Sequence, residues 1–238
     1  MFTIKVAGVC VEIDNRYGFV EDVCRDYIVR NGEEPAFRVQ ITSDEVHRML
    51  SGATWNLTAP MAESYLINRQ LCRKMAEFDA YLFHSAVITY KGKCIAFSGK
   101  RGTGKSTHIG LWKDKFGKDV TVINGDKPLL ALRDGKLIAH GTPWCGKEGW
   151  QTNTSAALDA VVFLEQAKTN EIKTIGKEEF THRLSEQILP PANRDTADKF
   201  VELLHHTVEH VPAYVLKCNM NTTAVDTVVR EILEKKSS

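Results

Sequence analysis

One glycine-rich stretch constrains this chain more than any other. Residues 99–106 read Gly-Lys-Arg-Gly-Thr-Gly-Lys-Ser and match the phosphate-binding loop pattern G-x-x-x-x-G-K-S/T at every fixed position. Glycines allow the backbone to curl closely around an anion, so that successive N–H groups point at phosphate oxygens. In this pattern Lys105 reaches the β- and γ-phosphates of a nucleotide, and the hydroxyl of Ser106 binds Mg²⁺. The predicted nucleotide-binding residues are Gly99, Lys100, Arg101, Gly102, Thr103, Gly104, Lys105, Ser106 and Thr107.

The residues on either side of the loop fit the strand–loop–helix setting that the pattern needs. Residues 93–97 read as an apolar strand that enters the loop, and residues 106–116 read as a helix that leaves it. A helix that begins here turns its positive N-terminal end toward the phosphates. An ordinary glycine-rich turn is the alternative, and the flanking pattern argues against it.

Composition and charge limit the kinds of partner and the cellular location that we expect for this protein. The chain has 238 residues, of which 43% are hydrophobic and 26% charged, so it is long enough to bury a substantial core. A net charge of +1 gives no electrostatic reason to expect nucleic acid or an anionic membrane surface. No apolar run approaches the roughly eighteen residues that cross a bilayer, and the start lacks a signal-peptide layout. The six cysteines are scattered without a C-x-x-C pair, and we expect a cytoplasmic protein.

Hydrophobic patterning predicts a small N-terminal unit and a larger core. Residues 1–60 read as a β-rich extension of the same sheet system, and residues 61–238 as the core that carries the loop. Residues 82–90 and 93–97 read as two strands joined by a tight turn, which predicts a β-hairpin immediately before the loop. A parallel nucleotide-binding sheet has a crossover helix at this point. We therefore expect an α/β fold with a mixed, twisted β-sheet, hairpins and flanking helices.

Periodicity places the remaining elements of the core. Apolar residues at helical spacing predict helices over residues 64–78, 177–189, 196–210 and 221–235. Short apolar runs predict strands at residues 120–123, 160–164, 172–175 and 214–216. The Asp134-Gly135 pair between two further runs predicts a second hairpin.

Asp126 is the strongest candidate for a second functional residue. It follows the apolar run 120–123, and phosphate-loop enzymes place a carboxylate near Mg²⁺ at the end of such a strand. There it serves as a metal contact or as a general base toward a hydroxyl nucleophile. The alternative is a simple turn aspartate in Asn124-Gly125-Asp126.

Other polar residues carry weaker signals. Glu148, in a glycine-rich loop, is either a metal ligand or a solvated side chain. Glu165 ends the run 161–164 and is either a rival carboxylate to Asp126 or an exposed strand end, and we favour the strand end. Arg183 and Arg194 flank a Pro-Pro break and are either phosphate clamps or surface arginines. Three histidines near the end of a predicted helix complete no recognisable metal site: His205, His206 and His210.

The order of these motifs resembles a known family. His84-Ser85-Ala86 before a hairpin, then the loop, then Gly125-Asp126, is similar to the catalytic domain of HPr kinase/phosphorylase and its relative, ATP-dependent phosphoenolpyruvate carboxykinase. The resemblance covers residues 80–150 and implies a mixed, strongly twisted sheet with a loop of that type. It implies that Lys105 binds phosphate, Ser106 binds Mg²⁺, and Asp126 deprotonates a serine-type hydroxyl. It also implies that His84 is hydrogen-bonded near Asp126 and that Glu148 is a further acidic metal-site residue.

We expect an ATP-dependent, Mg²⁺-requiring phosphotransferase related to HPr kinase, or one using another nucleoside triphosphate. It would move the γ-phosphoryl to a hydroxyl of a peptide, protein or small molecule. Relatives carry two adjacent acids where this chain has Asp126-Lys127. That difference favours the alternative, a nucleotide-binding module that senses ATP or GTP and acts through a partner. A nucleotide hydrolase is the third hypothesis, and the acceptor, the base preference and homo-oligomer formation stay open.

Overall fold

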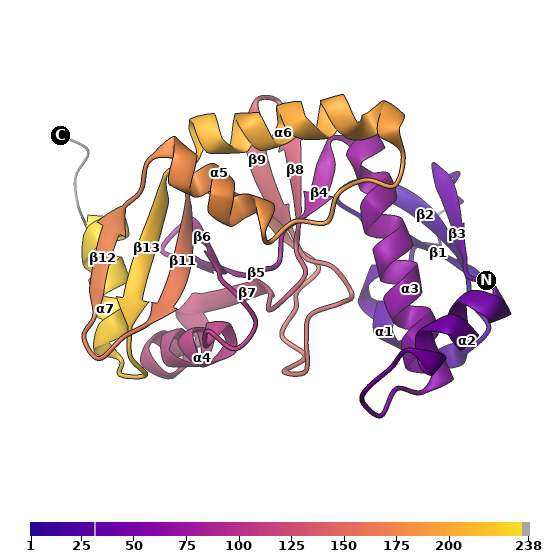
Figure 1. Ribbon diagram of the computed structural model, residues 1–238, viewed down its shortest axis with the longest axis horizontal. Coiled ribbons are helices and arrows are strands. Elements are labelled where there is room, and N and C mark those ends of the chain that lie inside the picture. The colour runs from indigo at the N-terminus through magenta and orange to yellow at the C-terminus, as the bar shows by residue number, and fades with distance from the viewer. Residues whose placement is uncertain (31, 235–238) are drawn as a thin grey trace.

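The described strands gather in three sheets, which follow one another along the long axis of the molecule (Figure 1). The computed structural model describes residues 1–30 and 32–234. The first sheet has the order β1 (Phe2–Val6), β2 (Val9–Asp14), β3 (Phe37–Gln40). The second has the order β10 (Ser155–Ala157), β9 (Lys136–His140), β8 (Leu129–Arg133), β4 (Ala80–Leu82). The third has the order β12 (Glu171–Thr174), β13 (Ala213–Cys218), β11 (Ala160–Gln166), β6 (Lys93–Ser98), β5 (Ser85–Tyr90), β7 (Val120–Asn124).

Helices flank these sheets, so the predicted α/β class with mixed sheets is confirmed. Beside the first sheet lie α1 (Gly18–Cys24), α2 (Ser43–Ser51) and α3 (Ala59–Lys74) (Figure 1). The remaining α-helices are α4 (Lys105–Phe116), α5 (Lys177–Ser185), α6 (Ala197–His210) and α7 (Thr223–Val228). Short 3₁₀ turns occur at Arg25–Tyr27, Met75–Phe78, Gly117–Asp119 and Arg194–Thr196.

The strands of residues 1–60 pair among themselves rather than with the other described sheets. In this unit α2 begins with a capping box between Thr42 and Glu45 and ends before Gly52. The core of the unit continues into the rest of the chain, because Ile4 belongs to one buried cluster with Leu71 of α3 and Leu129 of β8. A continuous core runs across residue 60, and the division there stays a prediction.

The predicted hairpin before the glycine-rich loop is present. β5 and β6 are antiparallel, with Ser85 opposite Ser98. Lys91 and Gly92 have φ values of 49° and 75°, as the mirror-image turn of a two-residue hairpin requires. β11 pairs with β6 in parallel, and β7 pairs antiparallel with β5. The strand that enters the loop therefore has one antiparallel and one parallel neighbour.

The expected strand over residues 82–90 is wrong in its extent. The chain leaves the second sheet after β4 and enters the third at β5, so that Phe83 and His84 connect the two sheets. Phe83 is fully buried, and the N–H of His84 donates to the backbone oxygen of Gln187 at 2.7 Å. The apolar pattern of residues 82–90 did not reveal that the chain passes from one sheet to another, because buried strands of both sheets use the same residue types.

Both faces of the third sheet are covered. Ala86 and Ile88 of β5 pack in one cluster with Trp112 of α4 and with residues of α7. Val87, between them, faces the other side and packs in the cluster that contains Phe180 of α5 and residues of α6. A sheet covered on both faces explains why its strands read as nearly continuous apolar runs.

The predicted helices of the core are present with altered bounds. α3 begins earlier than expected, at Ala59, and α5 ends at Ser185, ahead of the two prolines. The predicted last helix divides into α7 and a π-helical segment, Val229–Glu234, and its last expected residue, 235, lies outside the described residues. None of the described helices has the length and apolarity needed to cross a bilayer.

Acid should destabilise this fold through His108, whose side chain packs under the sheet. It is 3% exposed, its Nε2 accepts a hydrogen bond from Trp112 Nε1 at 3.1 Å, and burial lowers its pKa to about 4. An unfolded histidine titrates near 6.5. As the pH falls, His108 is therefore protonated in the unfolded state at a higher pH than in the folded state. The free energy of unfolding should drop by up to about 3 kcal/mol between roughly pH 6.5 and 4.

This prediction is checked by urea unfolding at pH 7 and at pH 5. The wild type should lose stability across this interval, and His108→Gln should lose clearly less. His140, whose pKa burial also lowers to about 4, is retained in both proteins and cancels in the comparison. Equal losses in the two proteins would contradict the assignment to His108.

Candidate functional site

The predicted phosphate loop connects β6 to α4. Gly99, Gly102 and Gly104 have φ values of +150°, +86° and +101°, which residues with a side chain rarely adopt. At Gly99 a Cβ atom would also lie 2.9 Å from Thr103 Oγ1 and 3.2 Å from the backbone oxygen of Leu164. At Gly102 and Gly104 it would meet nothing within 4 Å, so these glycines border open space. α4 begins directly after Gly104, which leaves its first N–H groups available to an anion.

Lys105 and Ser106 occupy the first turn of α4. The Lys105 ammonium is buried and donates to the backbone oxygen of Gly99 at 2.8 Å, so it spans the loop. Burial lowers the pKa of Lys105; the charge of Asp126 opposes this shift, and that of Lys127 adds to it. The side chain of Ser106 makes no hydrogen bond with any described residue. A hydroxyl without a protein partner beside a glycine-rich cradle fits a metal ligand.

A buried asparagine fixes the turn that carries Asp126. Asn124, at the end of β7, is fully buried, and its Oδ1 accepts from the N–H groups of Asp126 at 2.8 Å and Lys127 at 2.7 Å. Its Nδ2 donates to the backbone oxygen of Thr142 at 3.0 Å. The turn is therefore stabilised by Asn124, and the carboxylate of Asp126 is left for other contacts. Sequence reasoning missed this role of Asn124, although an Asn two residues ahead of an Asp is a recognisable turn signal.

The Asp126 carboxylate binds two side chains, one through each oxygen. Its Oδ1 lies 3.2 Å from Nε2 of His84, and its Oδ2 forms an ion pair with the Lys127 ammonium. Burial raises the pKa of Asp126, but the hydrogen bond from His84 and the charge of Lys127 outweigh it, so the pKa lies well below its usual range. Asp126 is therefore ionised at neutral pH, and it contacts His84 as the resemblance implies.

A glutamine from a distant segment orients His84. Gln187, which follows α5, accepts the His84 backbone N–H and places its Oε1 3.0 Å from His84 Nδ1. Because one ring nitrogen faces an amide oxygen and the other faces Asp126, the imidazole is held in one orientation. No local pattern in the sequence marks Gln187 for this contact.

Glu148 lies in the same region as Asp126. A Cβ atom at Gly146 would lie 3.2 Å from Cβ of Asp126 and 3.5 Å from Oε2 of Glu148, so both carboxylates border this glycine. Among the described residues, no group of three or more His, Cys, Asp or Glu side chains could hold a metal ion. Mg²⁺ commonly uses one or two carboxylates together with substrate phosphates and water. The residues present therefore fit a metal that arrives with a nucleotide.

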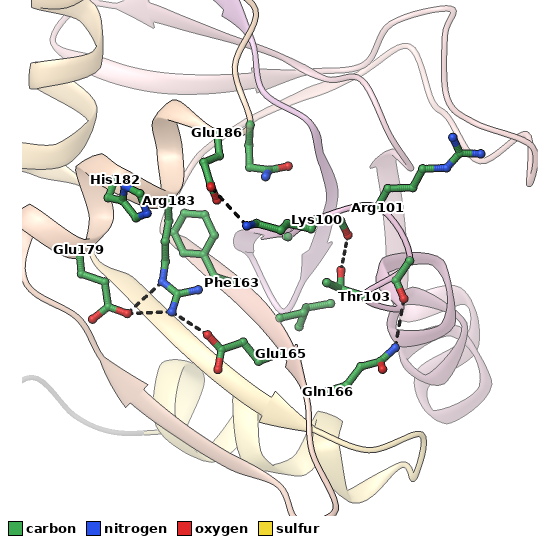
Figure 2. A pocket seen from close by; sticks show the side chains of 14 residues that line it. Lys100, Arg101, Thr103, Phe163, Glu165, Gln166, Glu179, His182, Arg183 and Glu186 are labelled. Carbon is green, nitrogen blue, oxygen red and sulfur yellow. Dashed lines mark hydrogen bonds and ion pairs between the residues drawn. The ribbon is translucent and has the colours of Figure 1, made fainter. Parts of the chain in front are cut away.

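A cavity of about 620 Å³ opens between the loop, the end of β11 and α5 (Figure 2). Arg183 lies in its wall and donates to Glu165 at 2.6 Å and to Glu179 at 2.9 Å. The Lys100 ammonium lies 3.3 Å from the carboxylate of Glu186, and both residues line the cavity (Figure 2). Glu165 is therefore an ion-pair partner rather than a merely exposed strand end, and Arg183 is paired with carboxylates. The lining residues are Gly99–Thr103, Phe163–Gln166, Glu179, His182, Arg183, Glu186 and Gln187.

Other residues considered from the sequence lie elsewhere. Arg194 belongs to the 3₁₀ turn that precedes α6, and it does not line the cavity. His206 and His210 stack on each other at 4.0 Å between ring centroids, and His205 lies 3.8 Å from Glu209. Arg101 does line the cavity, although the end of its side chain points outward in Figure 2.

No protein-family model matches this chain, and no curated protein matches it. Among solved structures it is similar to one described as the structure of the Hpr(Ser) kinase/phosphatase from Coxiella burnetii, with 10% sequence identity and a TM-score of 0.36. The match covers 63% of this chain and 93% of that chain. At this TM-score and identity the likeness is distant, and it carries no information about the activity of this chain.

Proposed function

We propose that this protein is an ATP-dependent, Mg²⁺-requiring phosphotransferase that moves the γ-phosphoryl group to a hydroxyl of a peptide, protein or small molecule. The observation that carries the proposal is the geometry of the glycine-rich loop, which Lys105 spans by donating to Gly99 at 2.8 Å. With it goes the carboxylate of Asp126, which lies 3.2 Å from His84 and whose charge acts on Lys105. A phosphate-binding lysine and a base close together are what hydroxyl phosphorylation requires.

In this proposal the loop and the start of α4 hold the phosphates. Backbone N–H groups around Gly102 and Gly104 would donate to phosphate oxygens, and Lys105 would exchange its contact with Gly99 for the β- and γ-phosphates. Ser106, with a carboxylate oxygen of Asp126 or Glu148, would hold Mg²⁺. The metal, when bound, neutralises charge on the phosphates and orients them.

Asp126 would act as the general base toward the acceptor. Its carboxylate would accept the proton of the acceptor hydroxyl while that oxygen bonds to the γ-phosphorus and the bond to the β–γ bridging oxygen breaks. His84, held by Gln187, would fix the direction in which the carboxylate points. His84 and Gln187 would therefore orient the carboxylate of Asp126, which is already ionised at neutral pH.

The cavity of Figure 2 is the proposed place of the ribose and base. β11 lies on one side of β6, and β5 and β7 lie on the other. The end of β11 lines the cavity, whereas Asp126 follows β7. A triphosphate that meets Asp126 with its γ-end would therefore direct its nucleoside toward the cavity, whose volume is in the range of ligand pockets.

The second candidate function is nucleotide sensing without transfer, and the ion pair between Lys127 and Asp126 favours it. A carboxylate neutralised by a neighbouring ammonium is a weaker acceptor for a proton. Such a module would bind ATP or GTP and present a surface to a partner.

Labelled nucleotide distinguishes these functions. The protein would be incubated with Mg²⁺ and ATP labelled in the γ-phosphate, alone and with serine-containing peptides, free serine and glycerol as acceptors. Label in an acceptor is the expected result and supports the phosphotransferase. Free labelled phosphate without any acceptor indicates a hydrolase, and binding without turnover indicates the sensing module. Absence of nucleotide binding in calorimetry would contradict all of them.

A further inference from the structure

Lys127 directly follows the proposed base and pairs with its carboxylate, and its surroundings carry a further inference that rests on the proposed function. We propose that the Lys127 ammonium is a built-in cation of the phosphotransfer site. It takes the place that a second metal ion would need at Asp126, so that the nucleotide binds with one divalent cation.

The backbone of Lys127 is held by buried groups. Its N–H donates to Oδ1 of Asn124 at 2.7 Å, and its carbonyl oxygen accepts from Oγ1 of Thr142 at 2.7 Å. Asn124 is fully buried, and Thr142 is 2% exposed. A surface lysine on a mobile turn lacks such anchors. The position of Lys127 is therefore fixed to the same framework as that of Asp126.

The ammonium of Lys127 lies inside the site rather than at its rim. It pairs with Oδ2 of Asp126, and 27% of its side chain is exposed. Besides burial, its positive charge also helps to lower the pKa of Lys105, at the start of α4. Because this ammonium holds one oxygen of Asp126, Lys127 belongs to the same site as the proposed base.

The described groups leave little room for a second metal ion. Asp126 uses Oδ1 for His84 and Oδ2 for Lys127. A further divalent cation beside this carboxylate would face the ammonium groups of Lys105 and Lys127, and like charges repel strongly where water is partly excluded. Glu148 is the remaining carboxylate at this point, and one or two carboxylates with phosphates suffice for one Mg²⁺.

The substitution Lys127→Asp tests this inference, because it removes the ammonium and adds a carboxylate beside Asp126. Free Mn²⁺ would be measured by electron paramagnetic resonance while protein is titrated in the presence of a non-hydrolysable ATP analogue. We expect one protein-bound Mn²⁺ per analogue in the wild type and two in Lys127→Asp. Lys118→Asp is the matched control, since Lys118 is exposed beyond the end of α4, and it should keep one.

Lys127→Gln keeps the test valid if the aspartate variant does not fold. It should bind one Mn²⁺ per analogue, with an affinity for the analogue about tenfold weaker, because the site loses the positive charge that the proposal gives it. Two Mn²⁺ ions in the wild type, one in folded Lys127→Asp, or wild-type affinity in Lys127→Gln would each overturn the inference while nucleotide binding stands. A wild type that binds no analogue at all would instead remove the proposed function, and the inference with it.

Discussion

Replacing Lys105 with alanine should raise the dissociation constant of Mg²⁺-ATP by about a hundredfold. The ammonium is the proposed partner of two phosphates, and a charge-assisted hydrogen bond contributes about 1.5–3 kcal/mol, where 1.4 kcal/mol corresponds to tenfold in affinity. The measurement is calorimetric titration of the purified protein with Mg²⁺-ATP.

The matched control is Lys118→Ala, which removes an exposed lysine that follows the same helix and should leave the affinity unchanged. Because Lys105 is buried and donates to Gly99, its loss also leaves a carbonyl without a donor. Urea unfolding of Lys105→Met, which fills more of the same space, separates a folding defect from a binding defect. Unchanged ATP affinity in a folded Lys105 variant would remove the premise of the phosphate loop.

The substitution Asp126→Asn should lower the rate of phosphoryl transfer by about 10²–10⁴-fold, the usual contribution of a positioned base. Asparagine has nearly the same shape, but it carries no charge and cannot accept the hydroxyl proton. ATP affinity should stay within a few-fold, because the loop is untouched and Glu148 remains as a carboxylate for Mg²⁺. The rate would be measured with the serine peptide that accepts label most readily from the wild type.

Asp134→Asn is the matched control for this change. Asp134 is also a turn aspartate, in the hairpin between β8 and β9, where its φ of 49° is one that asparagine adopts readily. Transfer by this variant should equal that of the wild type. A folded Asp126→Asn protein that transfers phosphate at the wild-type rate would show that Asp126 is not the base.

Lys127 links the two leading functions of the site. Through the resemblance, Lys127 stands where relatives carry a second acid, and this difference argues against catalysis. In the structure its ammonium lies against Asp126, where it either supplies charge during transfer or keeps the carboxylate from acting as a base. The Mn²⁺ titration and the Asp126→Asn rate measurement together separate these outcomes, because the first reports cation number and the second reports chemistry.

Much of the local structure could be predicted because short-range rules decide it. The hairpin before the loop follows from a two-residue turn at Lys91-Gly92, whose positive φ values only a few residues tolerate. The glycines of the loop are required by backbone geometry, as Gly99 illustrates, where a Cβ would collide with Thr103. α2 ends at Ser51, ahead of a glycine, for a similarly local reason. The nucleotide, metal and acceptor remain predictions.

The contacts of the candidate site could be predicted only in part. Asp126 and His84 were paired through resemblance, whereas Gln187, which orients His84, lies 103 residues farther along the chain. Arg183 and Glu165 meet because the end of β11 faces α5. The packing of α5 on the third sheet, where Phe180 and Phe163 share one buried cluster, brings these residues together. Apolar periodicity says which residues are buried but not which elements become neighbours.

The sequence by itself therefore determined the glycine-rich loop, its flanking strand and helix, and the hairpin before it, since each depends on backbone preferences within a few residues. Only the tertiary structure decided that the chain changes sheets at His84 and that Gln187, from a distant segment, orients this histidine. It alone placed the imidazole of His84 against the Asp126 carboxylate. The physical reason is that these contacts depend on the packing of distant segments, where burial raises the cost of every unpaired polar group and so selects its partner.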